Sequence, residues 1–295
     1  MPEKPAYSSA EEPQLVEWAK AGDMQAFEEL VSRYRDRIYV RGRDLADDIL
    51  GKMDFIDMIY FTAMGKEPDA RTRAMTNAII VTVTDHGLTP SAIAARMTIL
   101  GAPESLQGAV AAGLLGAGNH FLGTMQNAAA FTRDEIGELT DDDDDAAYAA
   151  RAQEVVRAFR AARRIVPGLG HPIHVEGDPR TPVLRRIAGE NGFDGRHWRF
   201  MAAVETAAQN EYGRQLPINA AGAVGATVSD MGLAPIWARA FALIGRSAGL
   251  LAHLMEELEN PQGQKIWDMI LEQDDSAECA GIADPARADR KVERK

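Results

Sequence analysis

Apolar residues recur at helical spacing along most of this chain. In the stretch 14–34, Leu15, Trp18, Phe27 and Leu30 repeat at intervals that return to one face of an α-helix. Helices are also predicted over residues 45–65, 71–84, 90–100, 105–130, 146–165, 182–191, 198–210 and 237–259. Glycine and proline mark several of the boundaries between these stretches. The pattern therefore predicts a protein built almost entirely of helices.

Two of these stretches have an unusual composition. Residues 79–84 read Ile-Ile-Val-Thr-Val-Thr, a β-branched run that on its own would suit a strand. Because the neighbouring segments are predicted helices, we interpret the run as part of a buried helix. Residues 105–130 are apolar and rich in glycine and alanine, which favours either a closely packed core or a seam between two copies of the chain.

Composition and charge narrow the class of protein. Of the 295 residues, 46% are apolar, which is enough for a sizeable core in one large domain or two lobes. The net charge of −12 argues against a nucleic-acid surface, because such a surface needs a net basic footprint. No apolar run reaches the length of a membrane span and no signal peptide is visible, so no membrane association is expected.

The chain shows no pattern typical of a disulfide or a metal site. Cys279 is the only cysteine, so we expect no internal disulfide and a reduced, cytoplasmic setting. No cysteine cluster or His-x-x-x-His pair indicates zinc, and no Gly-x-Gly-x-x-Gly or Walker-type loop indicates a nucleotide fold. The acidic run 141–145 is interpreted as a solvated loop before a helix, because adjacent aspartates define no coordination geometry. No metal and no permanently bound cofactor are predicted.

The segment 168–180, GLGHPIHVEGDPR, carries the most specific chemistry of the chain. A glycine turn presents His171, and Arg180 follows nine residues later. An imidazole titrates near neutral pH and a guanidinium is a fixed cation, so together they suit a substrate with a polarisable oxygen and a carboxylate. His174 lies in the same segment, at a position with no predicted role.

Two further segments add polar groups of the same kind. Residues 85–91, DHGLTPS, contain His86. Asp85 before it either orients the His86 ring or only caps the turn. Residues 241–253, FALIGRSAGLLAH, form an apolar helix that contains Arg246. A buried arginine needs an acidic partner, which would be either a substrate carboxylate or a side chain of the protein.

Together the three segments resemble the citrate synthase superfamily, and in particular the short citryl-CoA lyases and the matching module of ATP-citrate lyase. The resemblance extends over about residues 41–267. It implies an all-α, citrate synthase-like fold with a large helical domain and a smaller helical lobe, and it supports a helix over the β-branched run. The implied division gives a mobile N-terminus at 1–13, a large domain at 14–125 and 218–273, a small lobe at 126–217, and a disordered tail at 274–295.

The resemblance also implies roles for single residues. His171 and His86 match the histidines that contact the oxyacid part of the substrate. Arg180 and Arg246 match arginines that bind its carboxylates. A third arginine of the family, near the C-terminus, has no match here, and Lys265 lies close to its position.

Two departures from the family pattern bear on the reaction. The family places a catalytic aspartate in an Asn-Val-Asp-Gly segment, whereas residues 219–222 read Asn-Ala-Ala-Gly, so that Ala221 stands in its place. Citrate synthases also carry an enol-stabilising histidine, and Phe121 occupies that position here. The lyase branch tends to lack this histidine, so the second change agrees with it. Asn219, His120 or a water are the candidates to replace the aspartate.

The resemblance implies a carbon–carbon lyase, or the reverse condensation, acting on a citryl-CoA-like hydroxyacyl-CoA to give an acyl-CoA and an oxoacid. Because Ala221 replaces the aspartate, two alternatives stay open. One is a repurposed enzyme that hydrolyses or otherwise cleaves another CoA thioester. The other is a non-catalytic acyl-CoA binding protein. A CoA thioester and a small carboxylate are the expected ligands, and a homodimer is the expected assembly.

Overall fold

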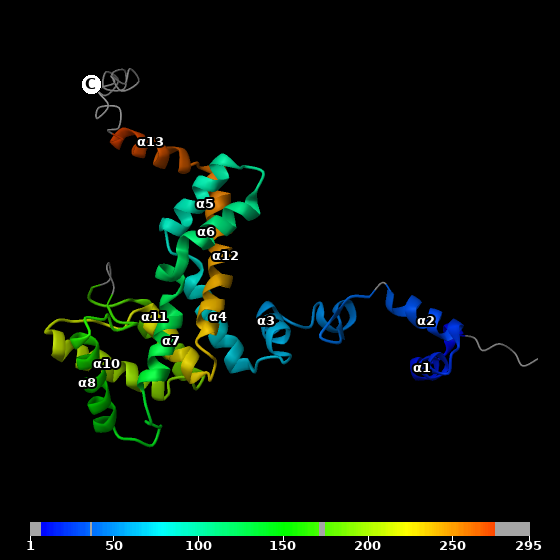
Figure 1. Ribbon diagram of the computed structural model, residues 1–295, viewed down its shortest axis with the longest axis horizontal. Coiled ribbons are helices and arrows are strands. Elements are labelled where there is room, and N and C mark those ends of the chain that lie inside the picture. Colours follow the sequence, from blue (N-terminus) through cyan, green and yellow to red (C-terminus); the bar gives the residue numbers. More distant parts are fainter. Residues whose placement is uncertain (1–6, 36, 171–174, 275–295) are drawn as a thin grey trace, which may run out of the picture. The chain divides into compact units, whose positions relative to one another are not determined.

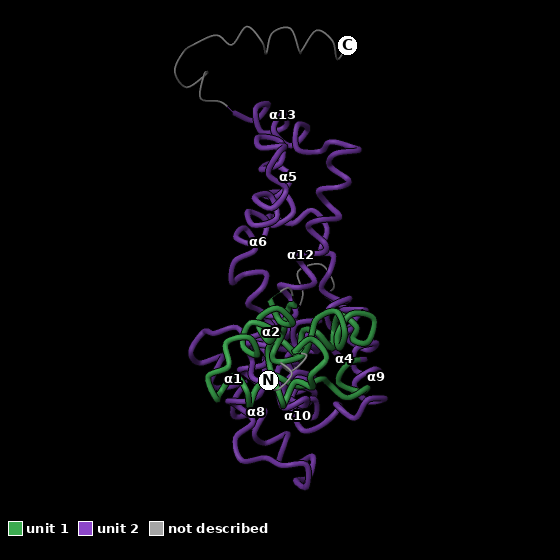
Figure 2. Tube along the Cα trace, turned by 90° about the vertical axis from the view of Figure 1, so that its right-hand side faces the viewer, with its two compact units in different colours: residues 1–73 green, residues 74–295 purple. Residues whose placement is uncertain are grey.

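The computed structural model describes residues 7–35, 37–170 and 175–274, and almost all of their regular structure is helical. The described part contains thirteen α-helices and one hairpin of two-residue strands (Figure 1). An all-α fold was predicted, and it is confirmed. The chain falls into two compact units, residues 1–73 and 74–295, which are coloured separately in Figure 2.

The first unit consists of short elements. They are a 3₁₀ turn (Tyr7–Ser9), α1 (Glu12–Lys20), α2 (Met24–Arg35), the antiparallel strands β1 (Tyr39–Val40) and β2 (Arg43–Asp44), a π-helical turn (Leu45–Ile49) and α3 (Phe55–Met64). The helix predicted over 14–34 is therefore two helices. Gly22 has a φ of 92° between them, and the Asp23 carboxylate accepts from the amides of Gln25 and Ala26 at the start of α2.

The segment 45–65 is also divided, where a single helix was predicted. The Gly51 backbone has a φ of 76°, and α3 begins only after Asp54. Asp54 and Asp57 form a reciprocal capping box, in which each carboxylate accepts from the other's backbone amide at 2.8 and 3.2 Å. Gly65 ends α3 in the left-handed conformation.

The second unit holds nearly all of the long helices. Helix α4 (Ala70–Thr84) enters it, followed by α5 (Pro90–Gly101), α6 (Leu106–Leu122), α7 (Thr124–Glu135), α8 (Asp145–Ala161), α9 (Arg180–Glu190), α10 (Arg196–Tyr212), α11 (Ala220–Asp230), α12 (Ile236–Glu259) and α13 (Gly263–Gln273). The β-branched run in α4 is helical, as interpreted, and buries Ile79 and Val83. The acidic run leads into α8 through Asp144, whose carboxylate caps the helix.

Helices α5, α6 and α12 lie side by side and form one part of the core (Figure 1). Leu250 and Leu254 of α12 are fully buried against Ile99 of α5 and Ala109 of α6. Complete burial of one such leucine stabilises the fold by roughly 1.5–3 kcal/mol. A Cβ at Gly113 would lie 2.8 Å from the Leu250 side chain, so glycine is what allows α6 and α12 to approach this closely.

Helix α11 is the most enclosed helix of this unit. Its residues 222–229 are all buried, and it packs against α7, α9 and α10. A Cβ at Gly225 would lie 2.6 Å from the Ala129 amide nitrogen, which explains the small-residue composition of this helix. The fully buried Trp198 donates to Thr227 at 3.0 Å. Helix α11 is thus held firmly against its neighbours.

The predicted seam over residues 105–130 is two helices. Gly118 has a φ of 50° and kinks α6, and Gly123 separates α6 from α7. No helix of the described part is long and apolar enough to cross a membrane. The predicted lobe boundaries near residues 125 and 218 stay a prediction.

Candidate active site

The loop before His171 is fastened to the start of α11. Gly168 has a φ of 84°, and a Cβ there would lie 2.7 Å from the Cα of Gly222. The Gly170 amide donates to the Pro217 carbonyl at 2.8 Å. Positive φ and close backbone contact both require glycine, which explains the glycine turn of this segment. His171 and His174 themselves fall at 171–174, outside the described residues, so their predicted roles stay predictions.

Asn219 caps α11 and ties the same loop to it. Its Oδ1 accepts from the Gly222 amide at 3.0 Å, and its Nδ2 donates to the Gly170 carbonyl at 2.6 Å. Its backbone amide donates to Gly168 at 3.0 Å. Both ends of the side chain are occupied by backbone groups, so Asn219 holds the loop in place in this structure.

Asp178 is a buried carboxylate that the sequence analysis gave no role. Its side chain is 1% exposed and accepts two hydrogen bonds from the Arg180 guanidinium, at 2.9 and 2.8 Å. It also accepts from the backbone amides of Arg180 and Ala220, both at 3.0 Å. Burial opposes its ionisation most strongly, but these donors outweigh burial and lower the pKa of Asp178 to about 2.

This clamp joins the start of α9 to the start of α11, next to Ala221. Asp178 is a carboxylate near the position of the missing family aspartate. With four donors around it and a pKa near 2, it is a poor proton acceptor at neutral pH. We therefore assign Asp178 to holding Arg180 and the α11 terminus rather than to proton transfer.

The Asp85–Gly87 turn lies after α4. The Asp85 carboxylate accepts from the amides of His86 and Gly87 at 2.7 and 2.9 Å. Both bonds lower the pKa of Asp85, and the bond from the Gly87 amide lowers it most. The exposed His86 ring packs edge-on against Phe121, with 6.1 Å between the ring centroids. The His120 ring packs edge-on against the same Phe121 at 4.9 Å. The structure thus brings the predicted residues His86 and His120 together around Phe121.

Arg246 is the strongest candidate for binding an anion. Its side chain is 7% exposed, yet it makes no hydrogen bond or ion pair with any residue in the described ranges. Burial lowers its pKa, while the Asp85 charge raises it and the Arg180 charge lowers it. Arg180 and Arg246 therefore lie close enough to repel each other. An anion between them would relieve both the repulsion and the desolvation cost.

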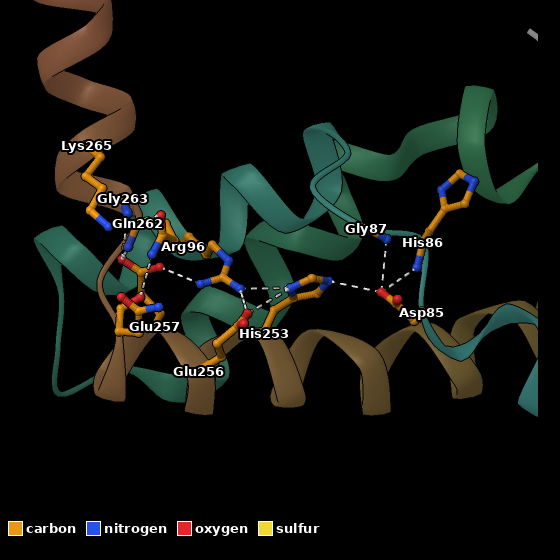
Figure 3. A network of polar contacts seen from close by, with 11 residues as sticks. Asp85, His86, Gly87, Arg96, His253, Glu256, Glu257, Gln262, Gly263 and Lys265 are labelled. Atoms are coloured by element: carbon orange, nitrogen blue, oxygen red, sulfur yellow. Dashed lines mark hydrogen bonds and ion pairs between the residues drawn. The ribbon is translucent and has the colours of Figure 1, made fainter. Parts of the chain in front are cut away.

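Lys265 does not join this group of residues. It is exposed on α13 and lies 3.4 Å from Gln262, whereas Asp85 and His86 lie at the opposite end of the network drawn in Figure 3. A separate recess of about 410 Å³ opens between α8 and α10 and contains none of the predicted site residues. Its two arginines, Arg185 and Arg199, are already paired with acidic side chains. Within the described residues, no group of acidic, histidine or cysteine side chains is arranged to hold a metal.

Two further polar residues lie beside the site and were not predicted from the sequence. Arg96 of α5 is buried, and His253 of α12 lies between Arg96 and Asp85. A signal was present, because His253 and Glu257 are four residues apart on an apolar helix, which puts both on its inward face.

Comparison with known proteins establishes the family. Residues 10–268 match the family model described as citrate synthase, C-terminal domain. The chain belongs to the citrate synthase family. It is 33% identical to citryl-CoA lyase from Hydrogenobacter thermophilus, covering 76% of this chain and 83% of that one, with a TM-score of 0.67. The predicted superfamily and its citryl-CoA lyase branch are thereby confirmed.

Two further relatives of this citrate synthase-family protein have lower sequence identity. ATP citrate lyase from Methanothrix soehngenii, solved with citrate and coenzyme A, is 23% identical over 74% of this chain and 36% of that one, with a TM-score of 0.60, which shows a shared fold. Putative citrate synthase 2 from Mycobacterium tuberculosis is 27% identical over 214 residues, or 71% of this chain. The chain spans about half the length (54%) of this curated relative.

Proposed function

We propose that this protein is a carbon–carbon lyase that cleaves citryl-CoA or a similar hydroxyacyl-CoA into an acyl-CoA and an oxoacid, or that it runs the reverse condensation. The observation that carries the proposal is Arg246, a buried cation with no partner in the described residues, beside the Asp85–Gly87 turn. A site built to receive a carboxylate explains why the fold tolerates an unpaired buried charge. The 33% identity to a citryl-CoA lyase supports the same reaction.

In the proposed cleavage, a base removes the proton of the tertiary hydroxyl of citryl-CoA. The bond to the thioester-bearing carbon breaks, the hydroxyl carbon becomes the ketone of oxaloacetate, and the electron pair remains as the enolate of acetyl-CoA. The enolate then takes up a proton at carbon. We assign the hydroxyl to His171, the neighbouring oxygen atoms to His86, and the substrate carboxylates to Arg246 and Arg180.

Protonation of the enolate is the step for which this chain lacks the family's residue. Ala221 cannot transfer a proton, Asp178 has a pKa near 2, and both ends of Asn219 are engaged. A water or His120 remains as the proton donor in the proposed lyase. The presence of Ala221 in place of the family's aspartate favours the second candidate function, an acyl-CoA binding protein or an enzyme that hydrolyses another thioester.

The test is mass spectrometry of the purified protein with citryl-CoA, and separately with acetyl-CoA plus oxaloacetate. Acetyl-CoA released from citryl-CoA supports the lyase, and Ala221→Asp is then expected to raise the rate by up to about 10²-fold, because a general acid–base is restored. If neither wild type nor Ala221→Asp changes citryl-CoA, and coenzyme A binds tightly, the protein is an acyl-CoA binding protein and not a lyase. Release of free coenzyme A without oxaloacetate would identify a thioester hydrolase.

We also propose that the protein acts as a homodimer, as its resemblance to the family implies. Four apolar side chains on the outer face of α12 are at least 38% exposed, namely Leu243, Leu251, Met255 and Leu258. A second copy of this chain would cover such a stripe. Sedimentation velocity should give a dimer at micromolar concentration, and a monomer over the whole range would contradict the proposal.

A further inference from the structure

A chain of polar contacts runs from the N-terminus of α13 to the Asp85–Gly87 turn (Figure 3). At one end, the buried Glu257 carboxylate accepts from the amides of Gln262 and Gly263 at 2.9 and 2.6 Å. It also accepts from the Arg96 guanidinium at 2.6 Å. Arg96 is 1% exposed, so this pair fixes its position inside the helix bundle.

Arg96 in turn sets the tautomer of His253. Its Nη2 lies 3.0 Å from the His253 Nδ1, and the same nitrogen also contacts Glu256. Because a guanidinium only donates, Nδ1 must carry the lone pair in this contact. The ring proton of neutral His253 is therefore on Nε2. The buried Nε2 makes no hydrogen bond with the described residues, and the charged group that it approaches is the Asp85 carboxylate.

Nε2 lies 3.3 Å from the Asp85 carboxylate, within ion-pair distance and just beyond the usual range of N–H···O hydrogen bonds. The oxygen that it approaches is Oδ1, which also accepts from the amides of His86 and Gly87. The His253 ring thus lies within ion-pair distance of the Asp85 oxygen that orders the turn carrying His86.

The packing of α12 keeps this turn in place. A Cβ at Gly249 would overlap the Thr84 carbonyl oxygen, so glycine lets the end of α4 lie directly on α12. Arg246, Gly249 and His253 are three and four residues apart and so occupy one face of that helix. The unpaired Arg246, the Gly249 contact with the end of α4 and the His253 contact with Asp85 therefore all lie on α12.

From this geometry we propose that His253, oriented by Arg96, is a positioning residue that holds Asp85 and thereby sets the His86 ring relative to Arg246. The inference rests on the proposed function for its catalytic consequence only. The ordering of the turn is a property of the protein without substrate, and it is measured separately.

The experiment compares three substitutions of His253 in the full chain. His253→Phe keeps a ring but removes both polar contacts. His253→Asn keeps a polar atom near Nδ1 and loses the one toward Asp85, whereas His253→Gln places an amide nitrogen near Nε2. Hydrogen exchange of the segment 85–89 is measured for each variant without ligand, and kcat/KM for citryl-CoA is measured alongside.

His253→Phe and His253→Asn should speed exchange at 85–89 and lower kcat/KM by about 10-fold to 10²-fold, because small misplacements of a substrate contact have effects of this size. His253→Gln should restore most of both. Asp85→Ala should speed exchange at least as much as His253→Phe, because it also removes the acceptor of the His86 and Gly87 amides. The double variant should be no worse than Asp85→Ala alone, since His253 acts through Asp85. Thermal melting identifies any variant that fails to fold, in which case the other His253 variants decide.

Unchanged exchange at 85–89 in His253→Asn would overturn the proposal. Additive losses in the double variant would do so as well, because they would mean independent roles. Histidine ¹⁵N spectra give a further check, since a proton on Nδ1 of His253 contradicts the contact with Arg96. If wild type leaves citryl-CoA intact, the proposed function fails, whereas the exchange and spectra still decide the ordering of the turn.

Discussion

The two arginines of the site occupy contrasting surroundings, although the family resemblance implies the same role for both. Arg180 begins α9 on the surface side and is clamped by the buried carboxylate of Asp178. Arg246 lies inside α12, more deeply buried, with no ion pair in the part of the chain that the structure describes. A paired arginine has its charge largely balanced before a ligand arrives, whereas an unpaired one presents the full charge. Arg246 should therefore dominate the binding of a carboxylate, and Arg180 should mainly shape the site.

The largest effect is expected from Arg246→Gln. Loss of a desolvated cation opposite a substrate carboxylate costs about 4 kcal/mol, or roughly 10³-fold in kcat/KM. The same change removes an unpaired buried charge, so the melting temperature of the ligand-free protein should rise. Citryl-CoA kinetics and calorimetry measure the two effects.

Arg186→Gln is the matched control for this prediction. Arg186 is 60% exposed on α9 and pairs with Glu190 one turn away, an arrangement that contributes less than about 1 kcal/mol. Neither activity nor melting temperature should change in the control. Equal losses in the two variants, or a lower melting temperature for Arg246→Gln, would mean that Arg246 serves the fold.

Asp178→Asn tests the paired side of the comparison. Removing one partner of a buried ion pair typically costs 3–5 kcal/mol of stability, and the new amide would also face donors. Arg180 is about a third exposed and can be hydrated, so we expect the lower end, about 3 kcal/mol. Urea denaturation measures it. A loss below about 1 kcal/mol would show that the clamp contributes little and that Arg180 is as available to a ligand as Arg246.

Much of this picture could be predicted from the sequence because it depends on local pattern. Helical periodicity indicated most of the helices, and the glycine turn at 168–170 was visible as a motif. The pattern did not show the breaks at Gly22 and Gly123, because apolar spacing continues on both sides of a short turn. Whether a glycine ends a helix depends on what packs against it, and spacing along the chain does not reveal that.

The pairing of charges was equally hidden in the sequence. The family resemblance implies carboxylate binding for both Arg180 and Arg246. Only tertiary contacts show that Arg180 pairs with Asp178, whereas Arg246 forms no ion pair with an acid of the described residues. The contact between Arg96 and Glu257 joins residues 161 positions apart, so no local pattern contains it. His253 is the last residue of the segment 241–253, yet its role depends on where α5 and the Asp85 turn lie in space.

The smallest effect, on acid stability, separates the two arginines most directly. The pKa of Asp178 falls from 3.8 in the unfolded chain to about 2 in the folded protein, so the folded state favours the ionised carboxylate. This contribution is fully present above about pH 4 and is lost as the pH falls through about 2, and it amounts to about 2 kcal/mol. Urea denaturation of wild type between pH 5 and 2 should show this loss, and Asp178→Asn should lack that part of it. Arg246→Gln should keep it, because Arg246 pairs with no carboxylate of the described chain that must ionise. If Arg246→Gln flattened the acid dependence as much as Asp178→Asn does, the two cations would share one electrostatic unit, and the contrast between a paired and an unpaired arginine would be wrong.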